Sequence, residues 1–196
     1  MRVISRESLA ELPIRRYEGP VSLVKTLPEL ADARADLRGE RVVGLDTETR
    51  PSFKKGEVHL PCLVQAATAR AVYLFQLSRL EVFPALAELL ASPAVVKAGV
   101  GLAYDLVQLK KVFPLTVENM VDLGVVARRR GLGQSGVRNL AGMLLGFRIP
   151  KGNRTSNWAA PFPRADHLRR NGCMGVPRAL PVLREPGTAD GGVAPP

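Results

Sequence analysis

The stretch VVGLDTETRP, residues 42–51, joins an apolar strand pattern to two acids, Asp46 and Glu48. Residues i and i+2 of a strand point to the same face, so the two carboxylates are predicted to project together. Two close carboxylates repel each other unless a cation lies between them, and Mg²⁺ or Mn²⁺ suits such oxygen ligands. The alternative is a solvated strand end, because D-x-E is a common pattern.

The segments around this stretch predict an α/β fold, a mixed sheet flanked by helices. Strand patterns occupy residues 21–24, 41–49, 60–68, 71–77 and 95–100, and helical patterns occupy 26–39, 84–92, 101–113, 121–130 and 136–146. Thr26 and Glu29 have the spacing of a capping box. Asp122 is expected in the first turn of its helix, and Ser135 is expected to cap the last one.

A third acid, Asp105, lies early in a helical pattern that follows a strand and a Gly-x-Gly turn. An Asp in the first turn favours the helix dipole, which is a purely structural role. The other interpretation is that the turn brings Asp105 over the end of the sheet, beside Asp46 and Glu48. Open α/β sheets bind ligands at the carboxyl ends of their strands, so this interpretation predicts a site with three carboxylates.

Four ordered segments resemble the DEDD (DnaQ-like) 3′–5′ exonuclease superfamily, in the branch of ribonuclease D and the Werner-syndrome exonuclease. They are GLDTET, PCLVQAATARAVYLFQL, VVKAGVGLAYDL and LAGMLLGFRIPKGNRTSNW, within residues 20–161. The resemblance implies a ribonuclease H-like sheet on which four acids hold two divalent cations, Mg²⁺ or Mn²⁺. A water activated there would hydrolyse the terminal phosphodiester bond of DNA or RNA.

The resemblance also implies roles for individual residues. Asp46, Glu48 and Asp105 would be catalytic metal ligands, and Thr49 and Trp158 would lie near the terminal nucleotide. The indole could stack on a base, or it could equally be a core aromatic. Basic residues near the first and last motifs fit a rim that binds the nucleic-acid strand: Lys54, Lys55, Lys151 and Arg154.

The family pattern continues after the Trp with a Tyr that orients the water and an Asp that completes the metal site. This chain continues instead with FPRADHLRRNGCMGVPRALP, which has neither. Its codons, shifted by one nucleotide, can encode S-P-x-Q-I-T-Y-A-A-T-D-A-W, and Met174–Gly175 forces that final Trp. We therefore expect a frameshift near Pro161. Residues 1–161 would be the exonuclease domain, with 1–20 peripheral, and 162–196 a disordered or loosely attached tail without the family's C-terminal helix.

Two functions remain open at this stage. The first is a metal-dependent 3′–5′ exonuclease, whose activity is in doubt because the Tyr and the fourth acid are absent. The second is a catalytically inactive remnant that binds nucleic acid through a basic surface. The net charge of +10 and the pI near 10.3 suit either, because a basic surface favours polyanions.

Other features of the sequence argue against a membrane protein, a nucleotide cofactor and a zinc site. No stretch approaches the ~18 apolar residues of a membrane span, and the start lacks a signal-peptide core, so a cytoplasmic protein without membrane contact is expected. GLGQSG at 131–136 matches G-x-G-x-x-G but follows a helical pattern instead of a strand, so no nucleotide cofactor is expected. Cys62 is expected to be a buried thiol, and the cysteines and histidines do not have zinc-ligand spacing.

Overall fold

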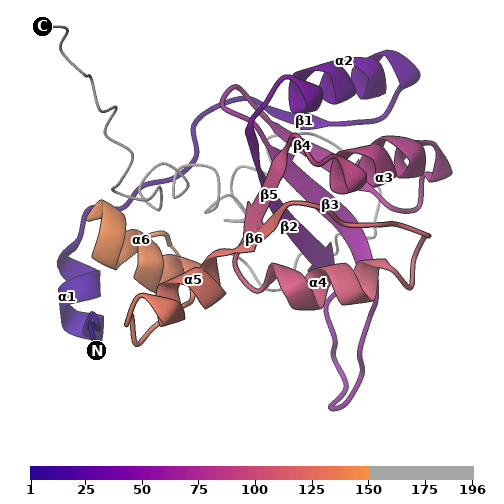
Figure 1. The fold of residues 1–196 in the computed structure, drawn as a ribbon. Helices are drawn as coiled ribbons and strands as arrows, with labels where there is room; N and C mark the ends of the chain where they lie inside the picture. Colours follow the sequence, from indigo (N-terminus) through magenta and orange to yellow (C-terminus); the bar gives the residue numbers. More distant parts are fainter. Residues whose placement is uncertain (151–196) are drawn as a thin grey trace, which may run out of the picture.

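The central strand, β2 (Val42–Thr49), lies inside a six-stranded sheet of order β1-β4-β3-β2-β5-β6 (Figure 1). The computed structural model describes residues 1–150. The other strands are β1 (Val21–Leu23), β3 (Pro61–Ala67), β4 (Val72–Gln76), β5 (Val96–Gly99) and β6 (Met120–Asp122). β3 runs antiparallel to β2 and β4, and the other three pairings are parallel. The predicted mixed sheet and its β3–β4 hairpin are confirmed.

Three helices cover one face of this sheet: α2 (Leu27–Arg38), α3 (Phe83–Ala91) and α4 (Leu102–Leu109). A short 3₁₀ helix, η1 (Leu80–Val82), leads into α3. Alternate strand residues such as Val43, Leu45 and Phe75 form one buried core with the inner faces of these helices. The opposite face of β1, β3 and β4 carries a second, smaller apolar cluster. β2 is therefore buried from Val43 to Leu45 and ends at a partly exposed polar tip.

The capping box of α2 is confirmed, with the Thr26 hydroxyl and the Glu29 carboxylate each accepting from the other's backbone N–H. The prediction that Asp122 lies in the first turn of a helix is wrong. Asp122 ends β6 and caps α5 (Leu123–Arg129) by accepting from the N–H groups of Gly124 and Val125. The local pattern does not reveal this, because β6 exists only through its pairing with β5.

The predicted cap of the last helix is wrong as well. α6 (Val137–Leu145) begins after Gly136, without a side-chain cap. Ser135 instead accepts a hydrogen bond from the Arg128 guanidinium, at 3.0 Å. The predicted end at Gly146 is confirmed, with a positive φ of 68° that suits glycine.

The N-terminal segment packs beside α5 and α6 and includes a helix that the sequence did not predict, α1 (Arg6–Glu11) (Figure 1). Ile4 and Gln134 exchange two hydrogen bonds, and Leu9 and Leu12 lie over Gly142, where any side chain would clash. Isolated bridges also join this segment to Leu132 and Arg148. Within the described residues, none of the helices is long and apolar enough to cross a membrane.

Candidate active site

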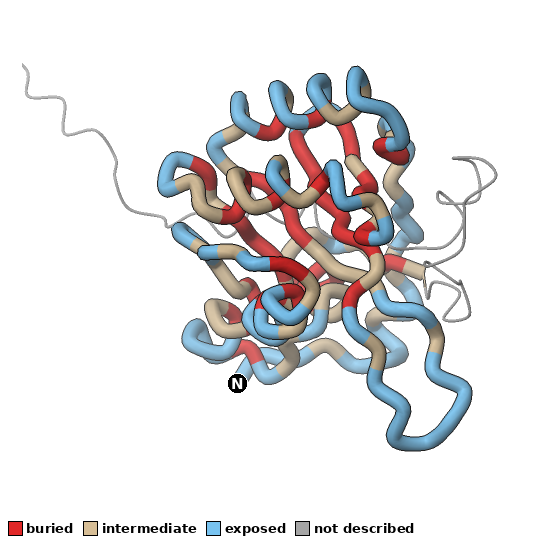
Figure 2. The backbone as a smooth tube through the Cα atoms, turned by 90° about the vertical axis from the view of Figure 1, so that its right-hand side faces the viewer, coloured by how far each residue is buried: buried red, intermediate tan, exposed pale blue. Residues whose placement is uncertain are grey.

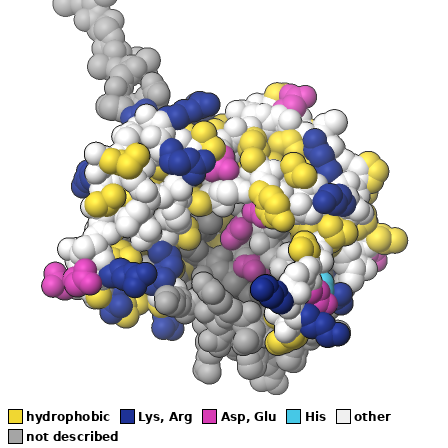
Figure 3. Space-filling view, turned by 90° about the horizontal axis from the view of Figure 1, so that it is seen from below, with side chains coloured by type: hydrophobic (Ala, Val, Ile, Leu, Met, Phe, Trp, Pro, Cys, Tyr) yellow, Lys and Arg dark blue, Asp and Glu magenta, His cyan; other side chains and the backbone are white. Residues whose placement is uncertain are grey.

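Asp46 and Glu48 lie at the carboxyl end of β2, on the face turned away from α2, α3 and α4. Their neighbour Leu45 belongs to the core under those helices, so alternation places the two acids on the other side. The Gln65 side chain on β3 donates a hydrogen bond to the Glu48 carboxylate, at 3.1 Å. The shared face predicted for the pair is thus present. Seen from this end of the sheet, acidic side chains gather near the centre of the surface (Figure 3).

Asp105 reaches the same end of the sheet from α4. β5 ends at Gly99, where an added Cβ would lie 2.4 Å from the Leu45 carbonyl oxygen, so only glycine allows this approach of β5 to β2. Gly101 then turns the chain with a φ of 76°, and α4 starts at the next residue. This geometry places Asp105 in the first turn, where the Thr47 side chain hydrogen-bonds to it.

Electrostatics connects the three acids. Burial first, then the charge of Glu48 and then that of Asp105 together raise the pKa of Asp46 to about 7, against the opposing effect of the hydrogen bond from the Thr47 N–H. Burial also raises the pKa of Asp105 to about 6; the charge of Asp122 adds to this effect and the hydrogen bond with Thr47 opposes it. Asp46 and Asp105 are therefore costly to ionise in this setting, and a nearby positive charge would lower that cost.

The donor set is chemically suited to hard divalent cations, since all three side chains offer carboxylate oxygens. The geometry is incomplete in one respect. Among residues 1–150, no three Asp, Glu, His or Cys side chains converge closely enough to hold one ion. The described residues thus contribute a pair of carboxylates and a nearby third acid, and any metal shell would need further oxygen donors.

Two residues in this region were missed by the sequence analysis. Gln65 positions Glu48, and Thr47 positions Asp105. A single polar residue inside the apolar strand PCLVQAA was the available signal for Gln65. Thr49 is exposed at an irregularity in the β2–β3 pairing, next to the acids. Trp158, Lys151, Arg154 and the predicted tail lie outside the described residues.

Two further features of the sequence, GLGQSG and Cys62, can be compared with the structure. The glycines of GLGQSG line the turn between α5 and α6, where the backbone of Arg2 is hydrogen-bonded to Gly131 and Gly133. The N-terminal segment therefore engages the Gly133 N–H in this turn, at 2.8 Å. Cys62, expected to be buried, is only half-buried and donates a hydrogen bond to the Glu48 carbonyl oxygen, at 3.4 Å; it is the second residue of β3, close to the exposed β2–β3 loop.

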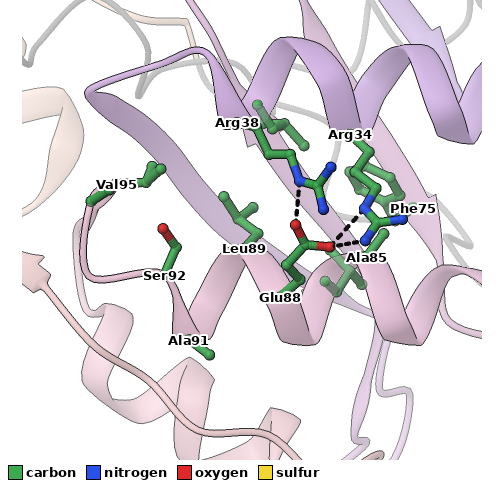
Figure 4. A pocket seen from close by; sticks show the side chains of 12 residues that line it. Arg34, Arg38, Phe75, Ala85, Glu88, Leu89, Ala91, Ser92 and Val95 are labelled. Atoms are coloured by element: carbon green, nitrogen blue, oxygen red, sulfur yellow. Dashed lines mark hydrogen bonds and ion pairs between the residues drawn. The ribbon is translucent and has the colours of Figure 1, made fainter.

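A pocket of about 390 Å³ lies between α2 and α3 (Figure 4). Its floor is apolar, and at its mouth the Glu88 carboxylate contacts the guanidinium groups of Arg34 and Arg38. Val95 also lines it, next to the start of β5, which pairs with the start of β2. The pocket is therefore at the opposite end of β2 from Asp46 and Glu48.

Comparison with known proteins places this arrangement in a family. The family described as 3′-5′ exonuclease matches residues 21–172. The chain is 34% identical over 125 residues to the mouse bifunctional 3′-5′ exonuclease/ATP-dependent helicase WRN, covering 60% of this chain and 9% of that protein. It is 26% identical over 174 residues to an Arabidopsis thaliana 3′-5′ exonuclease, covering 79% and 59%. The chain thus spans less than two thirds of either relative.

Solved structures support the same fold. The Nibbler EXO domain of Aedes aegypti superimposes with a TM-score of 0.66 at 23% identity, covering 81% of this chain and 83% of that one. Escherichia coli RNase D gives 0.64 at 18% identity, covering 78% and 40%. Trypanosoma brucei RNase D in complex with RNA U12 gives 0.62 at 20%, covering 77% and 57%. The chain belongs to the 3′–5′ exonuclease family, a class of hydrolases with a DnaQ-like fold.

Proposed function

We propose that this chain is a metal-dependent 3′–5′ exonuclease that hydrolyses terminal phosphodiester bonds of DNA or RNA. The observation that carries the proposal is the pair Asp46 and Glu48 near the carboxyl end of β2, with Asp105 in electrostatic range of Asp46. Their mutual effect on the pKa of Asp46 supports a location within reach of one another. The family match is independent support for the reaction class.

In this proposal, Asp46, Glu48 and Asp105 hold two divalent cations, Mg²⁺ or Mn²⁺. When bound, such cations lower the pKa of an attacking water and stabilise the departing 3′ oxygen. The chain's own contribution is placement. The Gln65 amide orients one Glu48 oxygen and Thr47 orients Asp105, so the acids are held before substrate arrives. Thr49, exposed at the same strand end, is proposed to contact the terminal nucleotide, as is Trp158.

The test is an assay with 5′-labelled DNA and RNA single strands, with Mg²⁺ or Mn²⁺ added or with EDTA. We expect stepwise shortening of the strand from its 3′ end. This shortening should be lost when EDTA is added and when the 3′ end is blocked. Asp46→Ala should abolish it, whereas Asp32→Ala, at an exposed acid on α2, should not. Full turnover by Asp46→Ala would refute the assignment. The rates on the two strands decide between DNA and RNA as substrate.

A second candidate is favoured by the incomplete ligand cluster among the described residues and by the absence of the family's Tyr and final Asp from the sequence. In this case the chain is an inactive remnant that binds nucleic acid through its basic surface. Binding that weakens steeply with salt, without cleavage even in Mn²⁺, would support it.

A further inference from the structure

Residues 50–60 form the β2–β3 loop, which begins two residues after Glu48. Hairpin loops commonly have about 2–5 residues, so this connection is much longer than joining two strands requires. It projects from the body of the protein and is exposed along its tip (Figures 1 and 2). Long ordered loops are frequently binding elements.

Side-chain contacts brace this loop across its width. The Ser52 hydroxyl donates to the Glu57 carbonyl oxygen at 2.8 Å, and the Glu57 N–H donates to the Lys54 carbonyl oxygen at 3.2 Å. Arg50 donates to His59 at 2.9 Å nearer the base. Gly56, with a φ of 86°, makes the turn at the tip. The tip residues are thus presented by a defined hairpin-like frame.

The tip exposes apolar side chains that do not contribute to the protein core. Phe53 is 83% exposed and Val58 is 73% exposed. The Phe53 ring therefore does not gain the stabilisation that burial of an aromatic side chain provides. An exposed aromatic ring on a braced, protruding loop is what a stacking contact with a flat partner requires.

The charge of the same tip is positive. Lys54 and Lys55 follow Phe53 directly and are exposed, and Arg50 lies at the base of the loop. Glu57 is the one acid in the loop, and its carboxylate lies 3.3 Å from the Nε2 of His59, the imidazole whose Nδ1 accepts from Arg50. An aromatic ring beside two exposed lysine ammonium groups complements a polyanion that carries flat bases.

We propose that the β2–β3 loop binds the single-stranded segment on the 5′ side of the terminal nucleotide. Phe53 stacks on a base, and Lys54 and Lys55 neutralise phosphates. The inference rests on the proposed function in one respect. If the 3′-terminal nucleotide occupies the carboxylates, the rest of the strand leaves the site on its 5′ side, past the loop attached to the end of β2.

A single strand fits this loop better than a duplex. In a duplex the bases are stacked on each other, so the lysines would find phosphates but Phe53 would find no free base face. In a single strand every base offers a π face, so stacking is tolerant of sequence. The loop is therefore expected to discriminate between single and double strands more than among sequences.

The test measures equilibrium binding by fluorescence anisotropy in EDTA, where no turnover occurs. The probes are a labelled single strand and a labelled blunt duplex of about 15 nucleotides, the upper size of a typical single-strand site. Phe53→Ala should weaken single-strand binding about tenfold and leave duplex binding nearly unchanged. Phe53→Trp should retain binding, because indole also stacks.

Lys54→Ala/Lys55→Ala should weaken binding and flatten its dependence on salt. Two lost phosphate contacts reduce the slope of log K against log salt by about 1.4, at about 0.7 for each phosphate of a single strand. Matched controls are Leu80→Ala, an exposed apolar residue of η1, and Arg15→Ala/Arg16→Ala, an exposed basic pair of the N-terminal segment. Both controls should bind like the unchanged protein.

The inference is wrong if the loop variants bind the single strand normally, if Phe53→Ala weakens the binding of both probes equally, or if the control variants weaken binding as much.

A second experiment distinguishes this inference from the proposed function. Its substrate is a dinucleotide, which is too short to extend past the site to the loop. Loop variants should cleave it normally while the KM for the longer strand rises. If no substrate is cleaved but the loop variants still lose binding, the proposed function fails and this inference stands.

Discussion

The two ends of β2 differ in how their charged side chains are surrounded: one end has a buried lysine with acceptors, and the other has two acids of like charge. At its start, the neighbouring strand β5 carries Lys97, which is fully buried and donates to the Ser92 and Val95 carbonyl oxygens at 2.6 and 2.8 Å. At its end, Asp46 and Glu48 face each other's like charge, and burial with that charge raises the pKa of Asp46 to about 7. The buried ammonium of Lys97 has its own carbonyl acceptors, which offset part of the cost of its burial, whereas the like charges of Asp46 and Glu48 oppose each other's ionisation, which is typical of a functional site.

The largest expected effect concerns the acidic end. Asp105→Asn should reduce exonuclease turnover by about 100-fold or more, because an acid positioned by Thr47 is replaced by a neutral amide. Steady-state rates on a labelled single strand measure this. The control is Asp32→Asn on α2, and circular dichroism should show both variants folded. Unchanged turnover would mean that Asp105 is only a helix-dipole residue.

The second prediction concerns the buried lysine. Lys97→Met keeps the length of the side chain but leaves the two carbonyl oxygens without their donor, so unfolding free energy should fall by about 1–3 kcal/mol. Urea denaturation measures the loss, with the exposed Lys25→Met as control. Turnover per folded molecule should be unaffected. A loss of activity without a loss of stability would overturn the division between the two ends.

The third prediction concerns pH. Asp46 keeps its proton up to about pH 7 when folded but loses it near its ordinary value of 3.8 when unfolded. Between these values the unfolded state binds fewer protons, so the stability of the metal-free protein falls as pH rises. From pH 5 to 7.5 the titration of Asp46 should cost about 2.5 kcal/mol of stability, at about 1.4 kcal/mol for each pH unit below its folded pKa, and thermal melts in EDTA measure this loss. Asp46→Asn should flatten most of this slope; an equally steep slope would exclude Asp46 as its cause.

The smallest expected effect is at the mouth of the pocket between α2 and α3. Glu88→Gln removes the ion pairs with Arg34 and Arg38, which lie in solvent, so the stability change should be below about 1 kcal/mol. Turnover and nucleic-acid binding should stay unchanged, since the pocket is at the far end of β2. Chemical denaturation and the anisotropy assay check both points. A clear loss of binding would connect this end to the substrate.

The sequence predicted correctly the features that depend only on neighbouring residues. The Thr26–Glu29 capping box and the Gly146 helix end need only neighbouring residues, and both are present. β6 was missed because its three residues become a strand only by pairing with β5. The N-terminal helix was missed because its apolar residues find their partners on α6, far along the chain.

For the candidate site, the sequence by itself determined that Asp46 and Glu48 share a face, because strand geometry alternates regardless of the surroundings. It also indicated, through the order of its motifs, the family to which the chain belongs. Only the tertiary structure decided the rest. The approach of β5 to β2 at Gly99 brings Asp105 into electrostatic range, and cross-strand packing supplies Gln65. Such distances depend on how separate segments pack, which no local pattern encodes.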